Sequence, residues 1–199
     1  MTSKTILASG SAIRQQILQN AGVSFTVSTA QIDEPAIIAS LLAENAKPRD
    51  IADTLAEYKG LRVSNRNPDA IVIAADQVLV CNGKVFSKPE NIAEARQQLE
   101  SLCGQGHQLL SAVVIFEDGK PVWRYIGRAQ LVMRAFSDQF LDDYIARSGE
   151  ELLTTVGCYK LETEGVQLFS NIQGDYFTIL GLPLLEVLGF LRTRGVLPE

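Results

Sequence analysis

The sequence predicts an α/β protein with a mixed central sheet flanked by helices, and three stretches carry that prediction. Residues 5–18 have the pattern of a short buried strand, a turn of small residues and then a helix. Residues 70–75 are a continuous apolar run, as expected of a strand buried on both faces. Residues 108–117 and 122–136 are β-prone segments joined at Asp118-Gly119, a hairpin signature that adds an antiparallel part to the sheet.

Length and composition are those of an ordinary globular protein. At 199 residues, of which 46% are hydrophobic and 21% charged, the chain fits one domain over residues 1–199, alone or with two lobes. The formal net charge of −5 argues against a nucleic-acid polymer as partner, because such binding depends on basic surface. The opening residues carry no apolar signal region, and no apolar run approaches the roughly 20 residues that span a bilayer. We therefore expect a cytoplasmic protein that has no membrane partner.

The turn after the first strand has the features of an anion site. Ser9, Gly10 and Ser11 offer hydroxyls and backbone N–H groups at a helix N-terminus, and Arg14 projects one turn later. Phosphate is the natural ligand of such a group. A structural alternative is that Ser11 only caps the helix while Gly10 permits the turn. The glycine fingerprint of dinucleotide-binding folds is absent, which argues against a Rossmann-type oxidoreductase.

A second strand is expected at 23–28, where apolar and polar residues alternate. It leads into a loop that carries Asp33 and Glu34, ahead of Pro35 and a new helix. Two carboxylates at that point could ligate a divalent cation, whereas adjacent acids in a loop are more often solvated. Both interpretations stay open.

Pro48 suits the first turn of a helix that we expect from about 49 to 63. Lys59 lies close to the buried side of this helix. A lysine in that position either extends to solvent at the rim of the helix or reaches into a cleft, and the spacing is compatible with both.

The apolar run 70–75 delivers Asp76 and Gln77 at the end of its predicted strand. Ligand sites in open α/β sheets gather at the carboxyl ends of strands, so Asp76 is a better catalytic candidate than an acid on a helix surface. The pair Asn82-Gly83 then predicts a type I′ hairpin. This hairpin returns the chain to Lys88, which we expect near Asp76.

The second half of the chain supplies further helices and one more strand. Glycines and capping residues indicate where these elements begin and end. We expect one helix at 92–102, one from Ser137 to before Gly149, and a last one that ends at about Arg192. A polar loop is expected at 157–165, followed by a strand at 166–172. The final helix is amphipathic, and we expect it to pack as a lid on the sheet.

Histidine and cysteine are too sparse for a zinc site. The chain has one histidine, His107, and three widely spaced cysteines without a Cys-x-x-Cys pair. His107 could act as a base, but a single histidine beside a strand is more often a hydrogen-bonded structural residue.

Taken together, these motifs resemble the Maf family of nucleotide pyrophosphatases, also called septum formation inhibitors. The resemblance extends from end to end of the chain. Each motif alone is weak, whereas the order and spacing of all of them are specific. The motifs are Leu7-Ala8-Ser9-Gly10-Ser11 followed by Arg14, Asp33-Glu34, Leu55-Ala56 before Lys59, Ala75-Asp76-Gln77-Val78, Lys88-Pro89, Gly104 to His107, and Gly181-Leu182-Pro183-Leu184.

The resemblance implies a cytoplasmic enzyme, often a homodimer, with a cleft between two α/β lobes. Such an enzyme uses a divalent cation, Mg²⁺ or Mn²⁺, to cleave a nucleoside triphosphate to the monophosphate and pyrophosphate. The family's catalytic acid falls on Asp76, which with Glu34 would hold the metal. Its phosphate-binding residues fall on Ser9, Arg14, Lys59 and Lys88.

Three positions tune the choice of base in the family, and they correspond here to Ile13, Gln77 and Glu162. The family's usual Ser-Pro-Arg-Arg is replaced by Ser11-Ala12-Ile13-Arg14, which removes the first arginine. Forms that resemble dTTP/UTP enzymes have arginine, threonine and glutamine at the three positions. The 7-methyl-GTP-like forms have an apolar residue, glutamine and glutamate, as this chain does.

A carboxylate at Glu162 can accept hydrogen bonds from both the N1–H and the exocyclic amine of guanine. It also attracts the positive charge that methylation of N7 leaves on the ring. We therefore expect a nucleoside triphosphate pyrophosphatase that prefers a modified guanine nucleotide such as 7-methyl-GTP. The alternatives are a dTTP/UTP pyrophosphatase of the same family and a non-catalytic regulator of cell division.

Overall fold

The computed structural model describes residues 4–198, which form two compact units built from interleaved segments. The first unit takes its residues from Met1–Gln77, Ser111–Gly127 and Asp175–Glu199, and the second from Val78–Leu110 and Arg128–Gly174. Residues 1–3, which entered the expectation about targeting, lie outside the described residues. Within the described part of the chain, no helix combines the length and the apolar character needed to cross a membrane.

The first unit is organised around a mixed sheet. The parallel part consists of β1 (Lys4–Leu7), β2 (Thr26–Val27) and β3 (Ala70–Cys81), with Leu7 paired to Val27 on one side and to Ile73 on the other. β5 (Gly106–Glu117) and β6 (Lys120–Met133) extend it in the order β2-β1-β3-β5-β6. The mixed α/β class predicted from the sequence is therefore confirmed.

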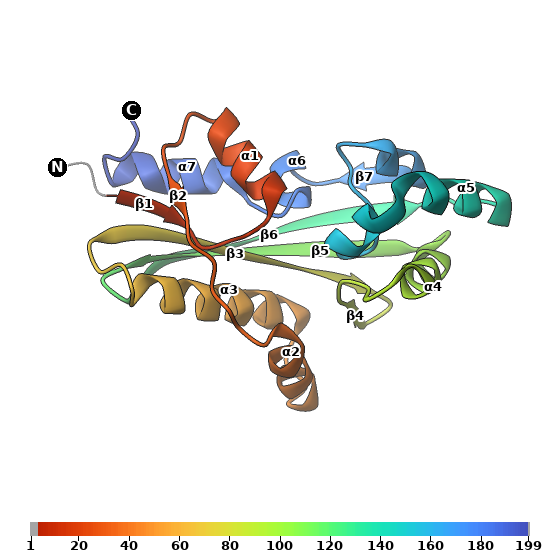
Figure 1. Ribbon diagram of the computed structural model, residues 1–199, viewed down its shortest axis with the longest axis horizontal. Coiled ribbons are helices and arrows are strands. Elements are labelled where there is room, and N and C mark those ends of the chain that lie inside the picture. Colours follow the sequence, from red (N-terminus) through yellow and green to blue (C-terminus); the bar gives the residue numbers. More distant parts are fainter. Residues whose placement is uncertain (1–3, 199) are drawn as a thin grey trace. The chain divides into compact units, whose positions relative to one another are not determined.

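Helices cover both faces of this sheet (Figure 1). α3 (Pro48–Ser64) lies on one face, and α1 (Ala12–Asn20) and α7 (Leu184–Thr193) lie on the other. α7 is part of the main core, because its buried side chains pack with those of the sheet and α1: Leu7, Ile17, Leu18, Ile73, Ala75, Val113, Leu184, Val187 and Leu191. α2 (Glu34–Ala43) precedes α3, and the short α6 (Tyr176–Ile179) precedes α7.

The second unit contains the ends of the long strands and the remaining helices. β3 turns at Asn82-Gly83 into β4 (Lys84–Phe86), and both turn residues have positive φ, of 49° and 79°, as the hairpin prediction requires. β7 (Phe169–Gln173) pairs antiparallel with β6. The helical elements are α4 (Ile92–Leu102), α5 (Asp138–Ser148) and the 3-10 helices η1 (Gly149–Thr154) and η2 (Glu164–Leu168).

Three predicted boundaries were wrong. β3 does not end before Asp76 but continues to Cys81, because pairing of its backbone with β5 does not depend on the polarity of the side chains. The strand expected at 23–28 is reduced to Thr26–Val27. Residues 164–168 form η2 before β7 begins, so the strand expected at 166–172 starts three residues late.

Candidate active site

Three charged side chains from three elements meet in the first unit. Asp76 projects from β3, Lys59 from α3, and Glu34 from the first turn of α2. Lys59 Nζ donates to Asp76 Oδ1 at 2.6 Å and lies 2.9 Å from Glu34 Oε1. The side chains of Lys59 and Asp76 are only 13% and 10% exposed, whereas Glu34 is 45% exposed. Lys59 therefore points into the protein and does not extend to solvent at the rim of the helix.

The Asp76 carboxyl is buried, and one of its two oxygens has no donor within the described residues. Burial raises the pKa of its carboxyl above the ordinary value, and the positive charges of Lys59 and Arg14 oppose that rise. Oδ1 is engaged by Lys59, and among residues 4–198 no group donates a hydrogen bond to Oδ2. A carboxylate with a raised pKa holds a proton more readily, so Oδ2 is suited to take one from a bound water.

Arg14 is turned into the protein. Its Nε donates to the Gly181 carbonyl at 2.7 Å, and its Nη1 donates to the Ala75 carbonyl at 2.9 Å and to Ser9 Oγ at 3.0 Å. Burial lowers the pKa of the Arg14 guanidinium, although nearby carboxylates oppose the shift. These bonds connect α1 to β3 beside Asp76 and to the turn before α7. Within the described residues, Nη2 is the one guanidinium nitrogen that donates to no acceptor.

The turn before α1 has the capping role that the sequence allowed. Ser11 is the N-cap, and its hydroxyl accepts from the backbone N–H of Arg14 at 3.5 Å. Ser9 is buried, and its hydroxyl accepts from Arg14 Nη1 and from the backbone N–H of Ser11. Ile13, which faces the core next to them, is half-buried. The anion site predicted here stays a prediction.

Gln77 belongs to a hydrogen-bond network that includes a residue missed in the sequence. Its Nε2 donates to Ser111 Oγ at 2.9 Å, to the Thr178 carbonyl at 3.2 Å and to the Ile179 carbonyl at 3.0 Å. Ser111 Oγ donates to the Thr178 carbonyl at 2.7 Å. Ser111 could have been noticed in the sequence, because it is the single polar residue in the apolar stretch 109–116.

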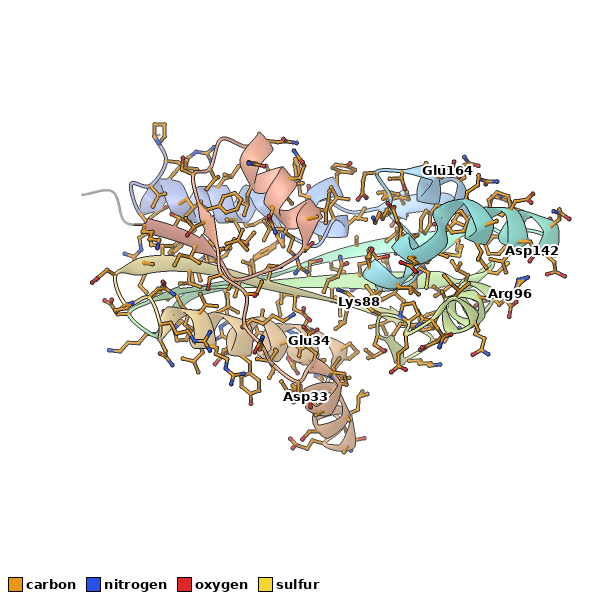
Figure 2. All side chains as sticks on the ribbon, viewed as in Figure 1. Asp33, Glu34, Lys88, Arg96, Asp142 and Glu164 are labelled. Atoms are coloured by element: carbon orange, nitrogen blue, oxygen red, sulfur yellow. The ribbon has the colours of Figure 1, made fainter. Side chains whose placement is uncertain are left out.

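Asp33 and Glu34 differ in role although they are adjacent at the start of α2 (Figure 2). Asp33 Oδ1 accepts from the backbone N–H of Ala36 at 3.0 Å and caps the helix, whereas Glu34 contacts Lys59. No cluster of three or more His, Cys, Asp or Glu residues that could hold a metal occurs among residues 4–198. Two carboxylates that already share one ammonium group nevertheless fit Mg²⁺, which is usually bound by one or two carboxylates together with water and phosphate oxygens.

Lys88 and Glu162 lie in the second unit. Lys88 is exposed on the segment that follows β4 (Figure 2), and Glu162 is exposed before η2. The nearby Glu164 is paired with Arg147 at 2.8 Å, which leaves Glu162 as the uncommitted acid of the two. Their expected positions beside the substrate stay predictions.

His107 is a structural residue of the second unit. It is 2% exposed, and its Nε2 lies 2.8 Å from the Tyr159 hydroxyl. Burial lowers the pKa of His107 to about 4, so the imidazole is neutral near pH 7. A hollow of about 390 Å³ in this unit contains none of the predicted site residues and has no Lys, Arg, Asp or Glu in its wall.

Fold and site define an α/β protein that carries a buried acid–cation cluster on one face of a mixed sheet. The model of the family described as Maf-like protein matches residues 4–194. The chain therefore belongs to the Maf-like protein family, which confirms the resemblance drawn from its motifs.

Relatives match over almost the whole chain. A protein of Ruegeria pomeroyi named nucleoside triphosphate pyrophosphatase is 53% identical over 197 residues, which are 99% of each chain. One of Rhizobium etli named 7-methyl-GTP pyrophosphatase is 46% identical over 197 residues, again 99% of each chain. A solved structure from Mycobacterium abscessus, titled a nucleoside-triphosphatase / dITP/XTP pyrophosphatase, is 13% identical with a TM-score of 0.45 and covers 98% of each chain.

Proposed function

We propose that this chain is a nucleoside triphosphate pyrophosphatase in which Asp76 is the general base. The observation that carries the proposal is the buried Asp76 carboxylate held by Lys59 at 2.6 Å. Water attacks the α-phosphorus and gives its proton to Asp76 Oδ2, while the bond to the bridging oxygen breaks and pyrophosphate leaves. Nucleoside monophosphate and pyrophosphate are the products. The names of the relatives from Ruegeria pomeroyi and Rhizobium etli support this reaction.

The remaining residues of the site have roles in holding the phosphates. Lys59 orients Asp76, and the free Nη2 of Arg14, the Ser9 turn and Lys88 bind phosphate oxygens. The charges of Arg14 and Lys59 are matched by those of Asp76 and Glu34. A highly anionic substrate therefore gains little attraction from this cluster alone, which supports a need for further positive charge.

Glu34 and Asp76 would supply that charge by holding a divalent cation, Mg²⁺ or Mn²⁺. The carboxylate oxygens of Glu34 and Asp76 are ligands that such an ion prefers. The ammonium group of Lys59 contacts both carboxylates, which supports a place for positive charge between them. When bound, such an ion neutralises charge that develops on the phosphates.

The finer proposal is a preference for a modified guanine nucleotide such as 7-methyl-GTP over dTTP and UTP. Ile13 would contact the base with an apolar surface, and Gln77 and Glu162 would read its hydrogen-bonding edge. Pairing of Glu164 with Arg147 supports Glu162 as the acid that is free for the base. Thymine and uracil offer one N–H between two carbonyl oxygens, which a carboxylate repels.

Substitution of Asp76 tests the reaction. A positioned base contributes about 10²–10⁴-fold, so Asp76→Asn should lose roughly that factor in turnover while the protein still folds. Pyrophosphate release is measured with Mg²⁺ over a panel of nucleotides that includes 7-methyl-GTP, UTP and dTTP. Near-normal release by Asp76→Asn would exclude the base assignment. If the unmodified protein released no pyrophosphate from any nucleotide, the alternative of a non-catalytic regulator of cell division would be favoured.

Location and assembly belong to the same proposal. Nucleoside triphosphates are made and used in the cytoplasm, so an enzyme that acts on them is expected there. The resemblance to the family also implies a homodimer, which light scattering on the purified protein would detect as twice the mass of 21.7 kDa. The acidic net charge of −5 favours a small-molecule substrate over a nucleic-acid polymer.

A further inference from the structure

The side-chain amide of Gln77 is held in one orientation by its neighbours. Its nitrogen faces Ser111 Oγ and the carbonyl oxygens of Thr178 and Ile179, at 2.9, 3.2 and 3.0 Å. Main-chain carbonyls accept hydrogen bonds and cannot donate them. With the amide reversed, Oε1 would face two carbonyl oxygens, so the nitrogen must occupy this position.

Ser111 completes this arrangement from the neighbouring strand β5. Its side chain is fully buried, and its hydroxyl donates to the Thr178 carbonyl at 2.7 Å. Because its single proton is used in that bond, the hydroxyl oxygen can only accept from Gln77. The buried serine thus reinforces the orientation that the two carbonyls impose.

We propose that Ser111 is a positioning residue for base recognition, which fixes Gln77 so that Oε1, and not Nε2, is offered to the substrate. The inference rests on the proposed function, in which Gln77 reads the base. An acceptor favours guanine and 7-methylguanine, which present an N1–H and an exocyclic amine. It disfavours uracil and thymine, whose carbonyl oxygens flank their one N–H. The network therefore selects between bases without a charged group.

Removal of the hydroxyl tests the proposal. Ser111→Ala removes one of the three acceptors of Gln77 Nε2, so the amide is held less firmly. The ratio of kcat/KM for 7-methyl-GTP to that for UTP should then fall roughly threefold to tenfold, as expected for one hydrogen bond. Ser111→Thr keeps a hydroxyl and should restore the ratio. Ser64→Ala is the matched control, because Ser64 is also a fully buried serine of the first unit and its hydroxyl accepts from the Gly119 N–H at 3.0 Å. This control should lower the melting temperature without changing the ratio.

A double-mutant cycle separates positioning from structure. If Ser111 acts through Gln77, Ser111→Ala should not change the ratio further in a Gln77→Ala background. Should Gln77→Ala alter the ratio while Ser111→Ala does not, the role of Ser111 is overturned and the proposed function stands. If Gln77→Ala leaves the ratio unchanged, base reading by Gln77 and positioning by Ser111 both fail. Hydrolysis itself is decided separately, by Asp76→Asn.

Discussion

The two adjacent acids at the start of α2 make different contacts, so their substitution can test the proposed metal ligand. Glu34 contacts Lys59, which also holds Asp76, whereas Asp33 caps the helix. Glu34→Gln should raise the Mg²⁺ concentration needed for half-maximal activity on the order of tenfold, because a charged oxygen ligand becomes neutral. Asp33→Asn keeps a good capping side chain and should leave that concentration unchanged. Equal Mg²⁺ curves for both variants would contradict a metal ligand at Glu34.

His107 should make the fold sensitive to acid. Its pKa is about 4 in the fold and about 6.5 when unfolded, so between these values the unfolded chain binds one proton more. Stability therefore falls as the pH drops, by about 2 kcal/mol from pH 7.5 to pH 5. His107→Gln can still bond Tyr159 but does not titrate.

Urea unfolding of both proteins at the two pH values measures this difference. Because the chain has one histidine, the part of the pH dependence that disappears in His107→Gln belongs to His107. The same loss of stability in both proteins would mean that His107 binds its proton as readily in the fold as in the unfolded chain, which contradicts the lowered pKa.

Some site residues could be predicted from the sequence because their own side chains carry the signal. Asp76 interrupts an apolar strand, and Lys59 lies near the buried side of an amphipathic helix. The inward turn of Arg14 had no such signal, since two of its partners are backbone carbonyls, at Ala75 and Gly181, 61 and 167 positions away. Carbonyl groups are present at every residue, so no side-chain pattern identifies the ones that accept. For the same reason, the hydrogen bond from Ser111 to the Thr178 carbonyl could not be predicted from the sequence.

At the scale of elements, hairpins and helices followed local rules and were predicted well. Asn82-Gly83 and Asp118-Gly119 form the expected turns, with positive φ at all four residues. Asn91 and Ser137 cap α4 and α5. The length of β3 was underestimated, because the polar side chains of Asp76 and Gln77 marked the end of the apolar run, whereas the strand continues through them to residues 79–81, which pair with β4.

Two helical glycines should respond in opposite directions to alanine. A Cβ at Gly60 in α3 would lie 2.4 Å from Cε2 of Phe116, whose side chain is fully buried. Overpacking costs about 1–3 kcal/mol and outweighs the gain in helix propensity, so we expect Gly60→Ala to lose about 1–2 kcal/mol. In α7, a Cβ at Gly189 would meet nothing within 4 Å, and Gly189→Ala should gain about 0.5–1 kcal/mol. Chemical denaturation measures both, and a stabilising Gly60→Ala would contradict the close packing of α3.

At the scale of the whole molecule, ligand binding should be visible as stability. A ligand at a hundred times its Kd stabilises the folded state by about 2.7 kcal/mol, which for a chain of this size raises the melting temperature by roughly 5–10 °C. Asp76→Asn with Mg²⁺ and 7-methyl-GTP should show that shift, because the variant binds without rapid turnover. Nicotinamide dinucleotides should give none, since the glycine fingerprint is absent. A clear shift with a nicotinamide cofactor would count against the proposed substrate class.

The interleaving of the first unit also determines when the site can exist during protein synthesis. Its core needs Leu184, Val187 and Leu191, and Arg14 is anchored on Gly181. A ribosome that has translated only as far as residue 174 holds a chain in which Asp76 and Lys59 are present but the support of Arg14 and Gln77 is missing. Until α7 emerges, the apolar side chains that pack against it lack their cover, which exposes them to chaperones and to misfolding. Catalytic competence is therefore acquired late in translation, with the arrival of the segment that closes the core.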